Sequence, residues 1–255
     1  MNGIDKLKVC LFVATALFSN IFPGINYVFS QSNSLNKYGL FVVKDTNILQ
    51  QEIYRNPSKK MVDLHKNISN LTLDLKYASS DNFMHEKLYP DIQTTFLRKP
   101  AADALKSVVN DLKKMNLGIK IFDAYRPYSV TEKMWEKVKD NRYAADPAKG
   151  SGHNRGVSVD LTLIDWVTKK ELPMPTGFDN FSDTAHQDFM DLPMQILKNR
   201  ETLKTVMENN GFIALNTEWW HFYLPDAASY ELLDLSFADL EMMEKKGKNN
   251  QALKE

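Results

Sequence analysis

The segment GSGHNRGVSVDLTLIDW, residues 150–166, places a histidine in a glycine-flanked turn just before an apolar strand that carries a carboxylate. Residues 157, 159, 161 and 163 are apolar, and a period of two puts Asp160 on the opposite face of that strand. The glycines let the preceding loop fold back, so that His153 can approach Asp160. The pattern indicates that the two residues share a metal ion, although a loop histidine and a solvated aspartate would also explain it.

A second segment, NTEWWHFYL, adds Glu218 and His221. In a strand of strict alternation, residues three apart point to opposite faces. We therefore expect either that a β-bulge redirects one of them or that only one is functional. The alternative is that the surrounding aromatic residues form core and that the two polar side chains lie incidentally at its edge.

Together, His153, Asp160 and His221 offer three nitrogen and oxygen ligands, which would leave the fourth position of a tetrahedral site open for water. Such a ligand set is typical of a catalytic zinc site. Glu218 beside it could take a proton from the bound water, as a glutamate does in zinc hydrolases. The other histidines have no second ligand at a useful spacing and are expected to be structural or exposed: His65, His85 and His186.

Composition narrows the remaining classes of function. The chain has 255 residues, of which 43% are hydrophobic and 25% charged, as is ordinary for a folded protein. Its 32 basic and 32 acidic residues balance, so no broad positive field would attract nucleic acid or an anionic membrane. We expect a small-molecule substrate, and no protein partner is implied.

The N-terminal region differs from the rest of the chain. Between Lys8 and Lys37 no residue is charged, and an apolar run follows a short basic region, as in a secretory signal. We expect residues 1–30 to be a signal peptide and the protein to be exported to the periplasm. An uncleaved membrane anchor is the alternative, although polar residues, a proline and a glycine interrupt the run before the roughly 20 residues that a spanning helix needs.

The single cysteine, Cys10, lies within this N-terminal region. Cleavage of the signal would remove it, and the mature chain would then have no disulfide, no thiol nucleophile and no cysteine-bound zinc. Any metal ion would have to be bound by histidine, aspartate or glutamate side chains.

Hydrophobic periodicity predicts the elements that position these residues. Strands are expected near residues 68–75, over LGIKIFDAYRP (117–127), over 157–163 and over FIALNTEWWHFYL (212–224). Helices are expected over residues 101–116, after a capping box of Ser129 and Glu132, and over 194–209 before Gly211. No repeat or linker divides residues 31–255, which we expect to form a single domain. This mixture of elements predicts the α+β class, with a central, mostly antiparallel sheet and flanking helices.

Five stretches in this order resemble the LAS-type zinc peptidases. SGHNRGVSVD contains their S-x-H-x-x-G-x-x-x-D motif, and EWWH contains their E-x-x-H motif. DLKYASSDNF, FDAYRP and MPTGFDNFSDTAH are most similar to the D-alanyl-D-alanine dipeptidases of the VanX type. The resemblance covers roughly residues 71–224.

The resemblance implies a LAS/hedgehog-like fold and one zinc ion per chain, which His153, Asp160 and His221 would bind. It implies the role of catalytic base for Glu218 and stabilisation of the transition-state oxyanion for Arg126. For Ser151 and Asp179 it implies positions in the substrate pocket, where Asp179 could hold an ammonium group. Without the resemblance, an exposed arginine paired with Asp123 explains Arg126 equally well. The implied activity is hydrolysis of D-Ala-D-Ala in cell-wall peptide recycling or glycopeptide resistance.

Two other functions stay open. A D,D-carboxypeptidase or endopeptidase acting on peptidoglycan stem peptides would use the same zinc chemistry, and a non-catalytic, zinc-stabilised binding module could use the same fold. Glu218 argues against the binding module, because a structural zinc site closes its fourth position and needs no base. The doubled tryptophan and the MPTGFDNFS segment favour the dipeptidase by family likeness alone.

Overall fold

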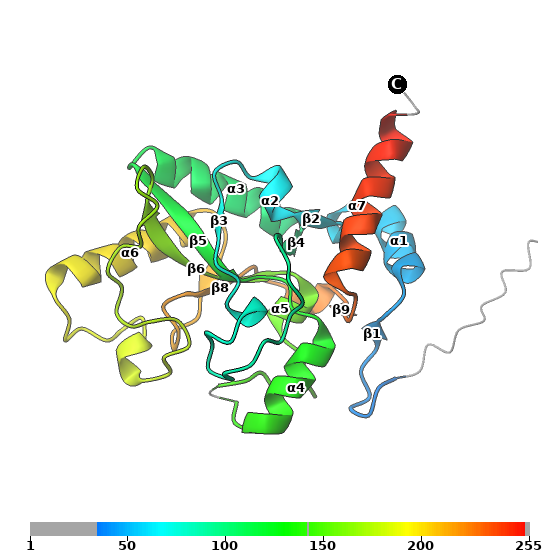
Figure 1. Cartoon of the computed structure of the whole chain (residues 1–255), viewed down its shortest axis with the longest axis horizontal. Helices are drawn as coiled ribbons and strands as arrows, with labels where there is room; N and C mark the ends of the chain where they lie inside the picture. The colour runs from blue at the N-terminus through cyan, green and yellow to red at the C-terminus, as the bar shows by residue number, and fades with distance from the viewer. Residues whose placement is uncertain (1–34, 142, 253–255) are drawn as a thin grey trace, which may run out of the picture. The chain divides into compact units, whose positions relative to one another are not determined.

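The computed structural model of the protein describes residues 35–141 and 143–252. The signal peptide or anchor expected over residues 1–30, and the domain boundary after it, lie outside the described residues. Helices and strands are mixed along the described chain (Figure 1), which confirms the α+β class. Among the described helices, none is both long and apolar enough to cross a membrane.

A five-stranded sheet in the order β3-β5-β6-β8-β7 lies at the centre. Its strand β3 runs parallel to β5, and every other neighbouring pair is antiparallel, as predicted. The strands are β3 (Thr72–Leu73), β5 (Leu117–Asp123), β6 (Ser158–Asp165), β7 (Ile213–Ala214) and β8 (His221–Tyr223). The two longest strands, β5 and β6, pair with each other inside this sheet.

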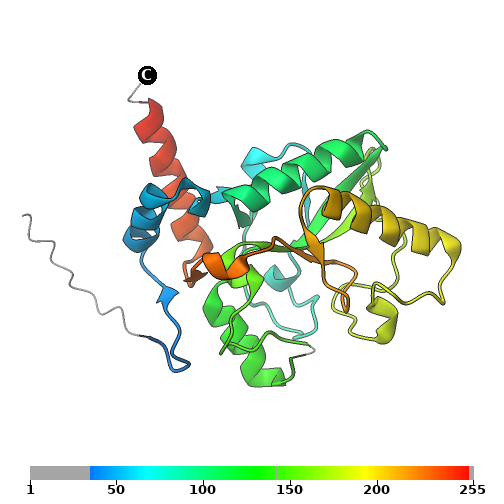
Figure 2. The same cartoon turned by 180° about the vertical axis from the view of Figure 1, so that it is seen from behind.

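Helices α3 (Lys99–Lys113) and α6 (Met194–Asn209) cover one face of this sheet, as Figure 2 shows from behind. Both helices were predicted from their periodicity. The apolar faces of α3, α6 and the two central strands meet in one buried core: Leu105, Val108, Val109, Leu112, Ile119, Ile121, Val159, Leu161, Leu163, Leu203, Val206 and Met207. The opposite face of β6, which carries Asp160, is left for polar residues.

The remaining elements lie beside the central sheet. Strand β1 (Val42–Val43) pairs in parallel with β9 (Leu232–Leu233), and β2 (Met61–Asp63) pairs antiparallel with β4 (Phe96–Arg98). The other helices are α1 (Thr46–Arg55), α2 (Leu64–Asn67), α4 (Tyr128–Val138), α5 (Gly152–Arg155) and α7 (Phe237–Ala252). Helix α1 packs against α7, so the first and the last helix of the described chain are in contact.

The strand predicted near residues 68–75 is shorter than its alternation suggested. Only Thr72 and Leu73 pair with β5, and a 3₁₀ turn, Lys76–Ala78, follows almost at once. The chain turns there because the carbonyl of Tyr77 accepts hydrogen bonds from the backbone N–H groups of Leu88 and Tyr89. Contacts with a distant segment, rather than local alternation, end this edge strand.

The capping box predicted for Ser129 and Glu132 is wrong. Helix α4 begins at Tyr128, directly after Pro127, so Ser129 is its second residue and cannot cap it. The backbone N–H of Ser129 instead donates a 2.8 Å hydrogen bond to the carboxylate of Asp234, 105 residues along the chain. Because the cap comes from a remote residue, no local spacing could indicate it.

The single strand predicted over residues 212–224 is two short strands, β7 and β8, joined by a turn. In this turn the N–H of Glu218 donates to the carbonyl of Leu215, and the N–H of His221 donates to the carbonyl of Glu218. Glu218 therefore lies outside the strand that carries His221. The expected conflict of strand faces does not arise, and no bulge between the two residues is needed.

The remote cap of α4 leads to a prediction about stability. Asp234→Ala should lower the free energy of unfolding by about 1 kcal/mol, because the N–H of Ser129 loses its acceptor. Asp234→Asn keeps an acceptor oxygen and should cost less. Ser129→Ala should stay within about 0.5 kcal/mol of the parent, as is usual for a surface change. Urea unfolding measures the free energy of unfolding of all three variants. A larger loss of stability in Ser129→Ala than in Asp234→Ala would show that Ser129 caps the helix after all.

Candidate active site

Strand register brings three polar side chains into a row on the sheet face opposite α3 and α6. Asp160 of β6 pairs with His221 of β8 on one side and with Asp123 of β5 on the other. The β5–β6 register shifts between Ile121 and Asp123. Without that irregularity the period of two would place Asp123 on the same apolar face as Ile121. A bulge near His221 was one of two alternatives from the sequence; the irregularity that shapes this site lies in β5.

Helix α5 positions His153 above this row. Ser151 caps the helix by accepting a hydrogen bond from the N–H of Asn154, whose side chain accepts one from the N–H of Ser151. At Gly156, φ is 71°, a left-handed conformation that favours glycine and ends the helix. A Cβ on Gly152 would lie 1.9 Å from the hydroxyl of Ser158, so only glycine fits this close approach to β6.

The imidazole of His153 is held by a backbone carbonyl. Its Nδ1 lies 2.7 Å from the carbonyl oxygen of Ala124, which can only accept, so Nδ1 carries the proton and donates it. The lone pair is then on Nε2, which faces Asp160 and His221. A hydrogen bond of this kind fixes both the tautomer and the orientation of a metal-binding histidine.

Three ligand atoms converge at this point, as the sequence predicts. His153 Nε2 lies 3.3 Å from His221 Nδ1 and 3.4 Å from one oxygen of Asp160, and the other oxygen of Asp160 lies 2.8 Å from His221 Nδ1. Nitrogen atoms bound to zinc at 2.0–2.1 Å in tetrahedral geometry lie roughly 3.3–3.4 Å apart. The donor set and its spacing therefore fit a metal ion of this size, and among the described residues these three side chains alone form such a cluster.

The carboxylates of the site differ in their affinity for protons. Burial tends to raise the pKa of Asp160, but His153 and His221 beside it bring that pKa well below its ordinary value. Burial raises the pKa of Glu218, and the nearby histidines only partly oppose this. Burial, together with the charge of Asp160, raises the pKa of Asp179 to about 8. Asp160 is thus suited to bind a cation, and Glu218 is suited to accept and return a proton.

Arg126 is buried rather than exposed, although it does pair with Asp123. Its Nε and Nη2 lie 3.0 and 2.7 Å from one oxygen of Asp123, whose other oxygen accepts a 2.8 Å hydrogen bond from the hydroxyl of Tyr89. The guanidinium also lies over the ring of Tyr77, 4.9 Å from its centre. The ion pair and the ring fix the direction of the guanidinium. The expected pairing with Asp123 is confirmed, the expected exposure is wrong, and the role at the oxyanion stays a prediction.

All seven residues singled out in the sequence line one cavity of about 230 Å³. They come from five parts of the chain: Arg126, Ser151, His153, Asp160, Asp179, Glu218 and His221. Ser151 also serves as the cap of α5, a structural role that the sequence did not indicate. The structure brings the predicted set together, while the individual roles stay predictions.

Two residues of the site were missed as functional candidates. The hydroxyl of Tyr77 donates to the carboxylate of Asp179 at 3.1 Å, and Asp123 orients Arg126. Both occur in stretches that carry the family resemblance, DLKYASSDNF and FDAYRP. The spacing of three residues between Asp123 and Arg126 could have indicated that the two side chains pair. The irregularity of β5 next to Asp123 could not be predicted from spacing.

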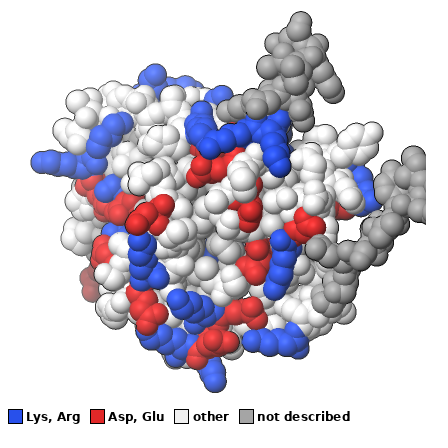
Figure 3. Space-filling view, turned by 45° about the vertical axis from the view of Figure 1, so that its right-hand side comes forward, with Lys and Arg blue, Asp and Glu red and all other residues white. Residues whose placement is uncertain are grey.

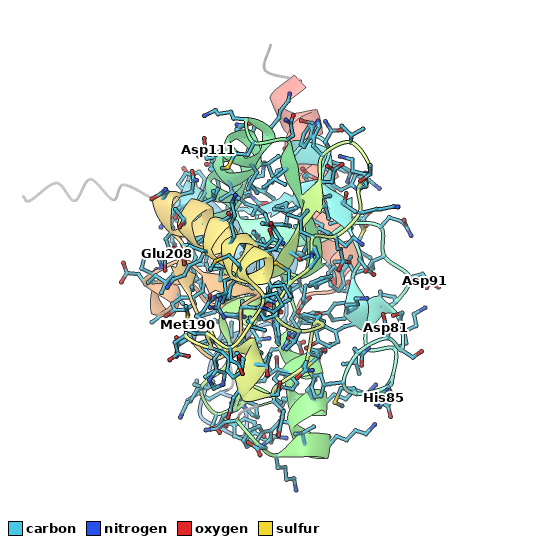
Figure 4. The ribbon with its side chains drawn as sticks, turned by 90° about the vertical axis from the view of Figure 1, so that its left-hand side faces the viewer. Asp81, His85, Asp91, Asp111, Met190 and Glu208 are labelled. Atoms are coloured by element: carbon cyan, nitrogen blue, oxygen red, sulfur yellow. The ribbon has the colours of Figure 1, made fainter. Side chains whose placement is uncertain are left out.

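The tryptophans lie in the core, and the remaining histidines lie outside the site, as one of the interpretations of the sequence predicted. Trp219 and Trp220 are buried and belong to the core, although Trp220 also lines the cavity. His65 and His85 are exposed, and His186 is half-buried. Figure 4 shows His85 on an exposed loop between Asp81 and Asp91. On the face drawn in Figure 3, basic and acidic residues are interspersed, in line with the balanced net charge.

Comparison with known proteins agrees with this geometry. Residues 57–241 match the peptidase family described as D-ala-D-ala dipeptidase. A D-alanyl-D-alanine dipeptidase of Escherichia coli is 36% identical over 179 residues, which cover 70% of this chain and 92% of that protein. One of Enterococcus faecium is 27% identical over 172 residues, with coverages of 60% and 85%. With this match over most of its length, and with candidate His and Asp ligands gathered in one cavity, the chain belongs to the D-ala-D-ala dipeptidase family.

Proposed function

We propose that the protein is a zinc-dependent dipeptidase that hydrolyses D-Ala-D-Ala to two D-alanine molecules, in cell-wall peptide recycling or in glycopeptide resistance. The observation that carries this proposal is the convergence of His153, Asp160 and His221 in the same cavity as Glu218 and Arg126. Membership of the family supports D-Ala-D-Ala as the substrate. The side chains that line the cavity support zinc-dependent hydrolysis.

Zinc is proposed as the metal because of the donor set. Two imidazole nitrogens and one carboxylate, with no cysteine, are typical of catalytic rather than structural zinc sites. The 3.3 Å separation of the two imidazole nitrogens supports a small, tetrahedrally bound ion. Zinc, when bound, supplies Lewis acidity, which makes a water nucleophilic near neutral pH and polarises a peptide carbonyl.

Glu218 is proposed as the general base. It is partly buried in the cavity and lies on the turn before β8, outside the three-residue ligand cluster. Because burial raises its pKa, its carboxylate binds a proton more strongly than an exposed glutamate does. It can therefore take a proton from water and return it to the departing amine of the dipeptide.

Arg126 is proposed to stabilise negative charge on the carbonyl oxygen as the water adds. Its buried pair with Asp123 raises its pKa well above the ordinary value, so the guanidinium stays charged. A fixed cation in a cavity shielded from water stabilises a developing oxyanion without reorganising in the transition state. Asp123 acts on this step by orienting Arg126.

Asp179 and Ser151 are proposed to bind the substrate. The carboxylate of Asp179 is oriented by the hydroxyl of Tyr77 and by the N–H of Phe83. An ammonium group next to it would favour its ionised form, which burial otherwise disfavours. The hydroxyl of Ser151 accepts from the N–H of Asn154 and keeps its own hydrogen free to donate to substrate.

We further propose that residues 1–30 direct export and are then removed. The support is the charge-free apolar run that follows a short basic region. The mature protein should begin at Gln31, and N-terminal sequencing of protein recovered from the periplasm checks this. Recovery of the intact N-terminus in the membrane fraction would instead indicate an anchor.

The first functional prediction separates the metal ligands from the base. Glu218→Ala should keep one zinc ion per chain, while hydrolysis falls on the order of 10²- to 10⁴-fold through loss of the proton acceptor. His153→Ala should lose the ion itself, because one of three protein ligands is gone. Metal analysis after dialysis and a D-alanine release assay measure the two effects. Equal loss of zinc in both variants would show that Glu218 is a ligand rather than the base.

The second functional prediction separates a dipeptidase from a carboxypeptidase. Free D-Ala-D-Ala should be hydrolysed well, whereas N-acetyl-D-Ala-D-Ala and a pentapeptide stem should be poor substrates, because in both the nitrogen of the penultimate D-alanine is an uncharged amide that cannot form an ion pair with Asp179. Without that ammonium group Asp179 holds its proton near neutral pH, since its pKa is raised to about 8, and the ion pair that would bind the dipeptide is lost. Release of D-alanine from all three substrates, measured side by side, is the test. Comparable turnover would assign the protein as a carboxypeptidase.

A further inference from the structure

We propose that an aromatic wall, in which Phe181 and Tyr143 line the cavity and Phe83 packs behind Phe181, bounds the cavity next to Asp179 and limits the substrate to two residues. This inference rests on the proposed dipeptidase function and deepens it, because it assigns substrate length to particular side chains. Asp179 would recognise the charge of the substrate's amino group, and the wall would exclude any volume added to that group.

The three rings are packed edge to face. The centres of the Tyr143 and Phe181 rings lie 4.9 Å apart with an angle of 80° between their planes. Those of Phe83 and Phe181 lie 5.5 Å apart at 89°. Phe181 also contacts Trp220, which is buried in the core, with ring centres 6.2 Å apart. Phe181 is therefore supported from several sides and cannot easily rotate away from an incoming group.

The wall joins two segments that are far apart in sequence. Tyr143 belongs to the connection between α4 and α5, which leads to His153, whereas Phe181 belongs to the connection between β6 and the 3₁₀ turn at Asp183–Ala185. Both side chains line the cavity. Their contact joins these two connections where both side chains line the cavity.

The wall begins next to the proposed ammonium site. Phe83 donates its backbone N–H to the carboxylate of Asp179, at 3.3 Å, and contributes its ring to the wall. Phe181 is two residues after Asp179 and lines the same cavity. A third amino acid joined to the substrate's nitrogen adds its volume beside Asp179, where these rings stand. The cavity of about 230 Å³ is small for a ligand site, which favours a short substrate.

Charge and volume can be separated by choice of substrate. Gly-D-Ala-D-Ala keeps a positive ammonium group but adds one residue, so its rejection measures length rather than loss of charge. We compare kcat/KM for D-Ala-D-Ala with kcat/KM for Gly-D-Ala-D-Ala, and take their ratio as the length selectivity of the full-length zinc enzyme. The parent enzyme should strongly prefer the dipeptide, since a closed pocket discriminates by steric clash.

Tyr143→Ala should lower this length selectivity on the order of tenfold or more, because it removes one ring of the wall. Tyr143→Phe keeps the ring and should keep the selectivity. Phe181→Leu shortens the opposite side of the same contact and should lower the selectivity in the same direction, so it decides the question if Tyr143→Ala does not fold. Tyr54→Ala, at a tyrosine of α1 that is 90% exposed, is the matched control and should change nothing.

Two results would contradict the proposed role of the aromatic wall. Parent-like selectivity in a folded Tyr143→Ala or Phe181→Leu variant would show that the rings do not limit length. An equal loss in Tyr143→Phe and Tyr143→Ala would assign the effect to the hydroxyl instead of the ring. Failure of the proposed function looks different, because the parent enzyme itself would then leave D-Ala-D-Ala intact.

Discussion

A slip of one residue between β6 and β8 would turn Asp160 toward the apolar core and bring Val159 into the cavity, because side chains alternate along a strand. The observed register, with Asp160 opposite His221, is what allows two of the three candidate ligands to meet. Three apolar residues of β6 pack in the same core as α3 and α6 and oppose such a slip: Val159, Leu161 and Leu163. The core thus holds the site in place from the other side of the sheet.

The short segment that follows β5 connects most parts of the site. The carboxylate of Asp123 orients Arg126, and the carbonyl of Ala124 holds the imidazole of His153. The carbonyl of Arg126 accepts a hydrogen bond from the side chain of Asn154, within α5. A displacement of this segment would therefore move the proposed oxyanion-stabilising charge and a candidate ligand together. The irregular pairing between β5 and β6 brings Asp123, at the start of this segment, opposite Asp160.

Three carboxylates in one cavity have different properties because their surroundings differ. Two histidines keep Asp160 ionised despite its burial, whereas burial makes Glu218 and Asp179 hold protons more strongly. Similar side chains can then serve for metal binding, proton transfer and recognition of an ammonium group. The aromatic wall adds a contribution that no charge supplies, since it acts on the volume of a substrate.

The sequence by itself determined the residue types of the candidate site and the strand face on which Asp160 lies. Apolar alternation in residues 157–163 predicted β6 and predicted that Asp160 points away from the apolar face of this strand. Helical spacing predicted α3 and α6. Local periodicity suffices for these elements because each buries one regular face against the core. Resemblance to the family then supplied the residues that spacing could not connect, including Arg126 and Asp179.

Only the tertiary structure decided the features that depend on partners distant in sequence. Glu218 left the strand because a turn between β7 and β8 holds it, and α4 took its cap from Asp234. The shift in β5 and the contact between Tyr143 and Phe181 likewise join segments that no local pattern relates. Periodicity reports which face of an element is buried, whereas hydrogen bonds and ring contacts between remote segments exist only once the core has brought those segments together.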